Sequence, residues 1–192
     1  MAVLGVARTP LAPADGALAG WHPVHLTALV LDALADVVAG ASGIDEVWVG
    51  CAEPVGAQGA DLARAAVVAS SLADTTPAFV VDGAEVSGSA ALRAGAGVAA
   101  GGSRVAVVGV GVASAVPDGA SALGRLYGRP WGDALEARLP GEVLPPPRLA
   151  ERAAADAGVA AADLVDWARR SRERRDVAAS ATAAGRLVVD ER

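Results

Sequence analysis

Residues 78–110 read AFVVDGAEVSGSAALRAGAGVAAGGSRVAVVGV. The apolar run at 78–81 follows a proline and predicts a strand, and the small residues from Ser87 to Ala100 predict a helix. The run at 104–110 is apolar almost throughout, which is typical of a strand buried on both faces. A strand, a helix and a strand in this order indicate an α/β unit with a crossover helix.

The chain before this stretch shows the same alternation. Apolar runs predict strands at 2–6 and 46–51, and apolar residues at helical spacing predict helices at 23–39 and 61–72. The order over residues 1–117 is therefore β-α-β-α-β-α-β. It predicts an α/β layered domain whose sheet carries helices on both faces.

The pattern changes in residues 118–192, where we expect a second, smaller and mostly helical domain. Residues 118–147 are rich in glycine and proline and show no sustained period, so we expect irregular structure there. Residues 148–185 predict two helices separated by Gly158. The apolar residues 187–189 predict the start of a strand.

Composition excludes several classes of protein. The chain has 192 residues, 53% of them hydrophobic, with one cysteine and a net charge of −6. The apolar content excludes a disordered chain, and the single cysteine excludes a disulfide framework and a multi-cysteine metal cluster. The acidic balance argues against nucleic-acid binding. Because we find no signal peptide and no apolar run long enough to cross a bilayer, we expect a soluble cytoplasmic protein without a membrane partner.

Short segments along the chain match one known family in order. They are VARTP at 6–10, GALAG at 16–20 before His22 and Pro23, DEVWVGC at 45–51, VGAQGADLAR at 55–64, PAFVVD at 77–82, WARRS at 167–171 and AAGRL at 183–187. This series resembles the N-terminal half of a thiolase, the acyltransferase that condenses or cleaves 3-ketoacyl-CoA. The resemblance implies a thiolase-like α/β fold with a reduced loop domain, and acyl-CoA chemistry in lipid metabolism.

The catalytic positions depart from that family. Thiolases carry a nucleophilic cysteine after the third strand, where a helix N-terminus favours the thiolate. Residues 82–88 read DGAEVSG here, so Glu85 occupies the nucleophile position, and a carboxylate cannot form the thioester intermediate. The family also uses a histidine and a second cysteine from its C-terminal half. Since His22 and His25 both precede the second strand, the resemblance implies a pseudoenzyme that is not active alone.

Two candidate sites each allow two interpretations. Glu85 is either a general base acting on a bound acyl-CoA or a former catalytic position that tolerates an acid at a helix start. The basic run at 169–175 is either a solvated helix face with ion pairs or, by the resemblance, a contact for the phosphates of coenzyme A through Arg170 and Ser171. We expect no required cofactor, and a coenzyme A thioester is the ligand that the resemblance implies.

Three other features predict no site. Cys51 ends a strand and is interpreted as a buried structural cysteine. The glycines at 109–111 lack the following helix that a dinucleotide loop requires. His22 and His25 are three residues apart, but no third ligand accompanies them, so we predict no metal site.

The helix expected from Ser87 to Ala100 predicts a partner. It has one charge, Arg93, and lacks the polar stripe of a surface helix, so we expect it to be buried on every side. Its glycines each cost about 1 kcal/mol relative to alanine, so tertiary contacts must hold it. The α/β domain of residues 1–117 resembles only the N-terminal half of a thiolase, and we do not expect it to supply all of these contacts. We therefore expect a homo-oligomer, or a heteromer with a thiolase-fold subunit, joined through this helix and the strand Ala78–Val81.

Three functional hypotheses follow. The first is a structural or regulatory subunit of a thiolase-fold complex that processes acyl-CoA. The second is a subunit of an enzyme of altered chemistry, a retro-aldolase or decarboxylase of an acyl-CoA, with Glu85 as its base. The third is a fragment of a decayed gene without a function.

Overall fold

The computed structural model of the protein describes residues 2–38, 43–122, 131–139 and 146–178. The chain divides into two compact units, Met1–Gly128 together with Gly185–Arg192, and Arg129–Ala184. We describe the two units separately. The domain division at residues 117 and 118 stays a prediction.

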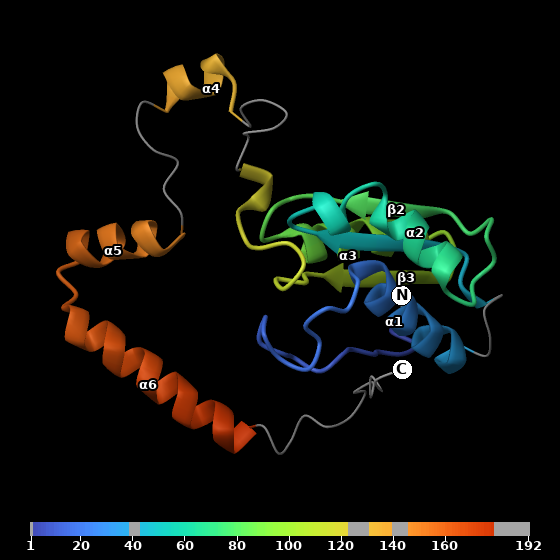
Figure 1. Ribbon diagram of the computed structural model, residues 1–192, viewed down its shortest axis with the longest axis horizontal. Coiled ribbons are helices and arrows are strands. Elements are labelled where there is room, and N and C mark those ends of the chain that lie inside the picture. Colours follow the sequence, from blue (N-terminus) through green and yellow to red (C-terminus); the bar gives the residue numbers. More distant parts are fainter. Residues whose placement is uncertain (1, 39–42, 123–130, 140–145, 179–192) are drawn as a thin grey trace. The chain divides into compact units, whose positions relative to one another are not determined.

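A parallel sheet of three strands forms the centre of the first unit, in the order β2-β1-β3 (Figure 1). The strands are β1 (Glu46–Cys51), β2 (Ala78–Val81) and β3 (Val105–Val110). In register, Val47 lies beside Ala78 and Glu46 beside Val105. All three strands lie where the apolar runs predict them, which confirms the α/β interpretation, and the structure shows that they are parallel.

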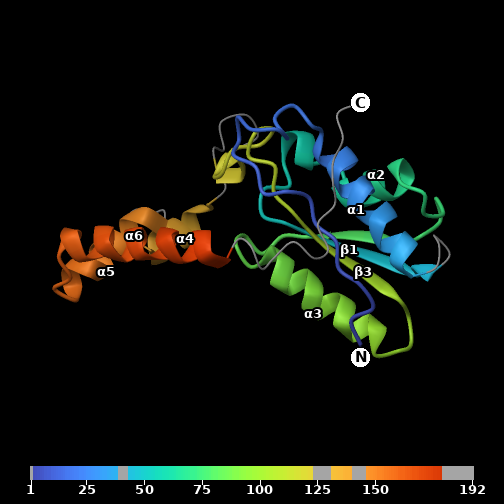
Figure 2. The ribbon, with the colours of Figure 1, turned by 90° about the horizontal axis from the view of Figure 1, so that it is seen from below.

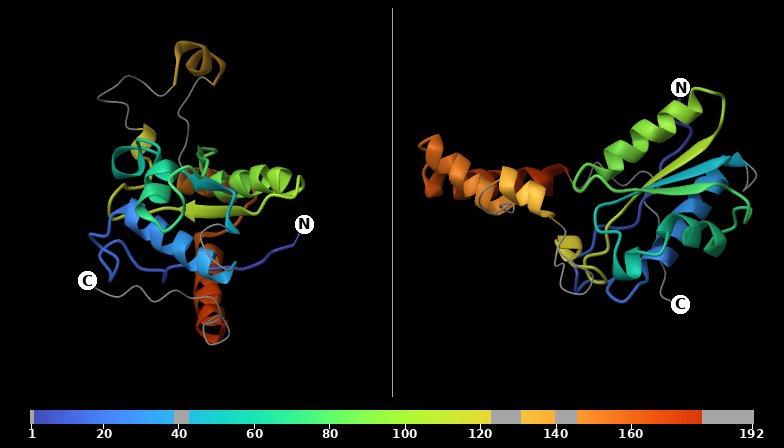
Figure 3. Two further views of the ribbon diagram at one scale, coloured as in Figure 1. Left: turned by 90° about the vertical axis from the view of Figure 1, so that its right-hand side faces the viewer. Right: turned by 90° about the horizontal axis from the view of Figure 1, so that it is seen from above.

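Helices cover both faces of this sheet, as the alternation predicts (Figure 2). They are α1 (Pro23–Val37), α2 (Leu62–Ala69) and α3 (Ser87–Ala99). Figure 3 shows α1 and α2 together on one face and α3 alone on the other. Each helix forms within a segment that predicts it, although α2 is shorter than expected and ends at Ala69.

The core lies between the sheet and the pair α1 and α2. Its central side chains are fully buried and come from both layers: Leu31, Val47, Val49, Cys51, Leu62, Ala66 and Val67. β3 adds Ala106 and Val108, whose side chains point to the same layer. These residues alternate with less buried ones along β1 and β3, as the period of two in a strand requires.

The strand predicted at 2–6 does not form. These residues run along α1 without strand structure, and Gly5 lies so close to that helix that an added Cβ would overlap Cγ1 of Val37. Val3 and Val6 are exposed. A strand needs a hydrogen-bonded neighbour, and this apolar run has no neighbouring strand among the described residues.

The expectation that α3 is buried on every side is also corrected for the single chain. Only the stripe of Ser87, Ala91 and Gly95 is buried, while Leu92 is 58% exposed. The same helix explains why β3 is not buried on both faces. The small side chains of α3 leave Val105 and Val107 half-buried.

The second unit contains three helices in its described residues: α4 (Asp133–Arg138), α5 (Pro146–Asp156) and α6 (Ala161–Ala178). The last two confirm the helices predicted within 148–185. The first is a correction, because it lies in the stretch predicted to be irregular. Asp133 in its first turn and Arg138 in its last complement the helix dipole, which favours this short helix despite the glycines and prolines around it. The 3-10 turn Ala120–Ala122 of the first unit lies in the same stretch.

Two sequence predictions cannot be compared with the structure. The end of the last predicted helix, at 179–184, and the strand start at 187–189 lie outside the described residues. Within the described residues, no helix combines the length and the apolar character needed to cross a bilayer.

Candidate functional site

The carboxyl ends of the three parallel strands meet at one edge of the sheet. β1 ends at Cys51, β2 is followed by Asp82, and β3 is followed by Gly111. Loops at this edge of a parallel sheet carry functional residues in many α/β proteins. The turn between β2 and α3, which contains Glu85, lies at this edge.

Hydrogen bonds within residues 82–87 hold this turn. Oδ1 of Asp82 accepts a hydrogen bond from the Ala84 amide at 3.0 Å. Oγ of Ser87 accepts one from the Gly83 amide at 2.9 Å and donates one to the Ala84 carbonyl at 2.6 Å. Ala84 adopts a φ of 50°, in the left-handed region that residues other than glycine seldom occupy. The turn therefore has a defined conformation that includes one strained residue.

A close backbone contact places the turn on the sheet. A Cβ at Gly50 of β1 would lie 2.5 Å from the carbonyl oxygen of Ser87 and 2.6 Å from Cα of Gly88. Only glycine at this position allows the first turn of α3 to approach β1 so closely. The N-terminus of α3 is therefore fixed over the end of β1.

Glu85 is exposed and precedes α3 by two residues. Its carboxylate makes no hydrogen bond or ion pair with any described residue. The structure thus places an acid at the start of a helix, and among the described residues its carboxylate has no hydrogen-bond or ion-pair partner. An isolated carboxylate can accept a proton from a bound molecule, but it cannot supply the thioester chemistry of a cysteine.

Cys51 is fully buried at the end of β1, as expected for a structural cysteine. Burial raises the pKa of its thiol more than a backbone hydrogen bond at Glu53 lowers it, and the carboxylates of Asp82 and Glu53 raise the pKa further. The thiol therefore stays protonated at neutral pH. Since the thiolate is the reactive form of cysteine, the environment of Cys51 does not favour a nucleophilic role.

The two histidines lie at the start of α1. Nδ1 of His22 accepts a hydrogen bond from the Val24 amide at 3.3 Å and so caps the helix. The rings of His22 and His25 are 5.8 Å apart, and both residues are exposed. No group of three metal-ligating side chains occurs among the residues described. The structure thus brings the two histidines together at the start of α1 and gives them no third metal-ligating side chain among the described residues.

Sequence reasoning missed two polar residues that organise the same edge of the sheet. The Glu53 carboxylate accepts hydrogen bonds from the amides of Gly119 and Ser121, both at 2.6 Å. Gln58 is buried; its Nε2 donates to the Glu53 carbonyl at 2.8 Å, and its Oε1 accepts from the Val112 amide at 2.7 Å. These bonds tie the loop after β1 to the segment after β3.

The hydrogen bonds also set the charge of Glu53. Burial alone would raise the pKa of its carboxyl group, but the hydrogen bonds from Ser121 and Gly119 outweigh burial and lower the pKa. Glu53 is therefore ionised at neutral pH, and its charge strengthens both hydrogen bonds. A glutamate in a loop carries no motif, so no signal in the sequence could have indicated this role.

Arg170 and Ser171 lie exposed on α6 in the second unit. The neighbouring Arg169 forms ion pairs with Asp166 at 3.3 Å and Glu173 at 2.7 Å. This part of the basic run is therefore a solvated face with paired charges, one of the two interpretations open from the sequence. A contact of Arg170 and Ser171 with coenzyme A stays a prediction.

The comparisons with known proteins agree with this fold. The family model of the thiolase N-terminal domain matches residues 1–121. The chain therefore belongs to the thiolase family, through its N-terminal portion.

A curated relative gives a more specific similarity. The steroid 3-ketoacyl-CoA thiolase FadA6 of Mycobacterium tuberculosis (strain ATCC 25618 / H37Rv) is 35% identical to this chain over 81 residues. That segment makes up 42% of this chain and 20% of the relative. The similarity therefore spans a fifth of the relative's length.

Proposed function

We propose that this chain is a catalytically incomplete thiolase-like subunit with a structural or regulatory role in a complex that processes acyl-CoA. The observation that carries the proposal is the exposed Glu85 in the nucleophile position, whose carboxylate has no hydrogen-bond or ion-pair partner among the described residues. The buried thiol of Cys51 does not compensate for this loss. The chemistry of the complex would then reside in a partner polypeptide.

The uncovered face of α3 supports the need for a partner. Leu92 on the helix and Phe79 on β2 are exposed apolar side chains on this side of the sheet, and Phe79 stacks on Trp48 with ring centroids 4.8 Å apart. On the opposite face of the sheet, α1 and α2 pack against the strands and bury their side chains. An apolar surface that extends over a helix and the adjoining sheet is typical of a protein interface.

The edge of the sheet at β2 indicates what kind of partner fits. β2 is an outer strand among the described residues, so its free backbone groups can pair with a strand of another sheet. A partner that offers both a strand and a helix-covering surface is most simply another thiolase-fold chain. We propose either a second copy or a different thiolase-fold subunit.

The ligand of the proposed complex is a coenzyme A thioester. Arg170 and Ser171 lie exposed on α6, and arginine is well suited to bind phosphate oxygens. Arg170→Ala should then weaken binding of a coenzyme A thioester to the complex. We propose no required cofactor.

The test is to measure assembly. The protein is purified with its native partners, or alone, and its mass is determined by light scattering. Leu92→Glu on the outer face of α3 should abolish assembly, whereas Val68→Glu, on the exposed side of α2, should not. Val68 is a matched control for Leu92, because the two side chains are 54% and 58% exposed and lie in helices on opposite faces of the sheet. A wild-type monomer that copurifies with no thiolase-fold protein would contradict the proposal.

The alternative, an acyl-CoA enzyme of altered chemistry, is favoured by one observation. Glu85 is exposed at a helix start, so a bound molecule could reach its carboxylate. In that case the partner supplies the remaining catalytic groups. Substitution of Glu85 separates the two proposals.

A further inference from the structure

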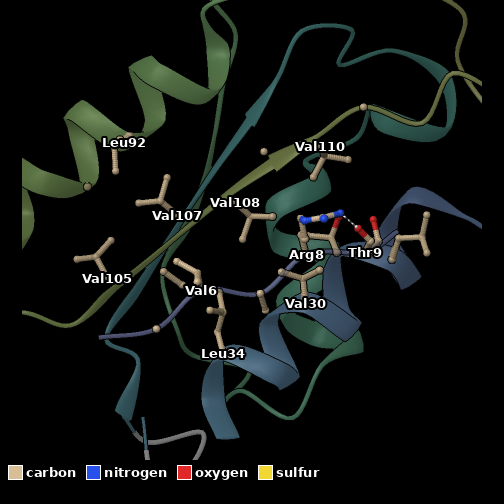
Figure 4. A pocket seen from close by; sticks show the side chains of 18 of the residues that line it. Val6, Arg8, Thr9, Val30, Leu34, Leu92, Val105, Val107, Val108 and Val110 are labelled. Atoms are coloured by element: carbon tan, nitrogen blue, oxygen red, sulfur yellow. Dashed lines mark hydrogen bonds between the residues drawn. The ribbon is translucent and has the colours of Figure 1, made fainter. Parts of the chain in front are cut away.

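Residues 111–122, which we call the strap, continue from the end of β3. Figure 4 shows Val110, the last residue of β3, beside an apolar cavity of about 920 Å³ that residues 111–114 help to line. Within the strap only Val116 is buried, and the other side chains are exposed or half-buried. A Cβ at Gly56 would lie 3.9 Å from Cγ2 of Val116, so this side chain packs beside the loop after β1. Few buried side chains therefore hold the strap in place.

Two side chains of the loop after β1 bind the backbone of the strap. The Val112 amide donates to Oε1 of Gln58 at 2.7 Å. The amides of Gly119 and Ser121 each donate to the Glu53 carboxylate at 2.6 Å. Hydrogen bonds to a charged acceptor are stronger than those between neutral groups. Glu53 therefore makes the strongest of these attachments.

The strap also has hydrogen bonds within itself. The amides of Ala115 and Val116 both donate to the Val112 carbonyl at 2.9 Å, and the Ala122 amide donates to the Gly119 carbonyl at 3.0 Å. These bonds between near neighbours do not depend on the loop after β1. A segment with few buried side chains opens at a lower free energy than the core to which it is joined. The strap can therefore separate from the loop with its own turns intact.

We propose that the strap opens as a unit while the sheet stays folded, and that Glu53 is the catch that keeps it closed. The closed strap occupies the hydrogen-bonding groups of Glu53 and Gln58 at the carboxyl edge of the sheet. Opening frees both side chains at the edge where the turn of Glu85 also lies. The strap is thus a conformational device that regulates access to this edge. This inference does not depend on the proposed function.

Hydrogen exchange of the full-length chain tests the proposal. In the unmodified chain, the protection factors of the Val112, Gly119 and Ser121 amides should agree within threefold, because one opening exposes all three. They should be at least a hundredfold lower than the protection factor of Val47 in the sheet. Glu53→Ala should accelerate exchange at all three strap amides at least tenfold, including that of Val112, which Glu53 does not bind. Exchange at Val47 should stay unchanged.

A milder substitution has a matched control. Glu53→Gln and Asp36→Asn each replace one carboxylate by an amide of the same shape, and Asp36 lies exposed on α1. Glu53→Gln should accelerate exchange in the strap less than Glu53→Ala does, because the amide oxygen still accepts a hydrogen bond. Asp36→Asn should leave exchange in the strap unchanged.

Thiol labelling gives a second readout, which remains informative if Glu53→Ala fails to fold. Val116→Cys places a thiol at the buried position of the strap, and Cys51, buried in the core, is the reference in the same chain. Each rate of reaction with iodoacetamide is divided by the rate in the unfolded chain. The introduced thiol should then react at least tenfold faster than Cys51, because only the strap must open. Adding Glu53→Gln should raise its rate further and leave that of Cys51 unchanged.

Three results would overturn the inference. One is exchange of the strap amides only at the rate of Val47, which means that the strap opens only when the sheet unfolds. Another is acceleration by Glu53→Ala at Gly119 and Ser121 without acceleration at Val112. The third is equal labelling of the introduced thiol and Cys51.

Discussion

Glu85 is the residue on which the chemical interpretation depends. The family resemblance predicts that it occupies the nucleophile position, and it lies in a turn that hydrogen bonds of Asp82 and Ser87 hold in one conformation. The turn therefore has a defined structure around a side chain that cannot form a thioester as a cysteine does. A carboxylate at this place is exposed and without a described partner.

Glu85→Gln separates the two proposed functions. The substitution keeps the size of the side chain and removes its charge. If the chain is a non-catalytic subunit, assembly and the turnover of the whole complex should both stay within twofold of wild type. Turnover of an acyl-CoA substrate and the mass of the complex are the two measurements. Loss of turnover with intact assembly would contradict the non-catalytic role and support Glu85 as the base.

The charge of Glu53 predicts a dependence of stability on pH. Burial raises and hydrogen bonds lower the pKa of this carboxyl group, and the lowering prevails. Its contribution is then complete above the pH at which an unfolded glutamate ionises, about 4.3, and is lost as the pH falls through the lower folded value. The melting temperature should exceed that of Glu53→Gln most at neutral pH, and the difference should shrink below about pH 4. A difference independent of pH would contradict this cause.

At the scale of elements, α3 depends on two glycines that let it approach the sheet. A Cβ at Gly50 would meet backbone atoms of α3, whereas a Cβ at Gly95 would lie 2.7 Å from Cγ2 of Val107, a side chain that can shift. Gly97 of the same helix has no atom within 4 Å of an added Cβ. Contact with the sheet, not helix preference, therefore explains glycine at the first two positions.

These three glycines predict a ranking of stabilities. Gly50→Ala should lower the free energy of unfolding by about 1–3 kcal/mol or more, as overpacking does, and Gly95→Ala should lower it less. Gly97→Ala should raise it by about 0.5–1 kcal/mol, because alanine is the better helix former. Urea denaturation of the three variants gives the measurement. Equal losses at all three positions would show that the close approach is not the cause.

At the scale of the whole molecule, the two faces of the sheet differ in how they are covered. α1 and α2 seal one face around fully buried side chains such as Val47 and Val49. The other face carries a single helix of small residues with Leu92 exposed. If a thiolase-fold partner covers this face, folding and assembly are coupled.

If folding and assembly are coupled, the thermal stability of the protein should depend on its concentration. The melting temperature of the assembled protein should rise by several degrees when its concentration is raised a hundredfold, because association stabilises the folded state. Leu92→Glu should melt at one temperature throughout the range, and Val68→Glu should behave as wild type. A wild-type melting temperature that is independent of concentration would contradict an obligatory partner.

Local pattern was sufficient to predict most elements of the fold. β1, β2 and β3 lie at apolar runs of β-branched residues, and α1 begins at Pro23 with a cap from the residue before it. The position of Glu85 at the start of α3 follows from the same local pattern together with the family resemblance. These features depend on neighbouring residues in the chain, which a sequence displays directly.

Other features depend on residues far apart in the chain, and local pattern could not indicate them. Glu53 binds amides 66 and 68 residues away, and Gln58 binds one 54 residues away. The apolar run at 2–6 has the composition of a strand but no neighbouring strand among the described residues. α4 occupies a stretch whose glycines and prolines predicted no helix.

The amino-acid sequence by itself determined the order of the strands and helices in the α/β unit and the family, and it predicted Glu85 at the nucleophile position, because each depends on residue type and spacing. Tertiary structure alone decided which side chains are covered. It left one side of α3 exposed, placed β3 at the edge of the sheet formed by the described residues, and brought Glu53 to the segment after β3. A side chain is buried only where another part of the chain packs against it, and a strand edge is paired only where another strand lies beside it. Only the folded chain shows where these contacts form.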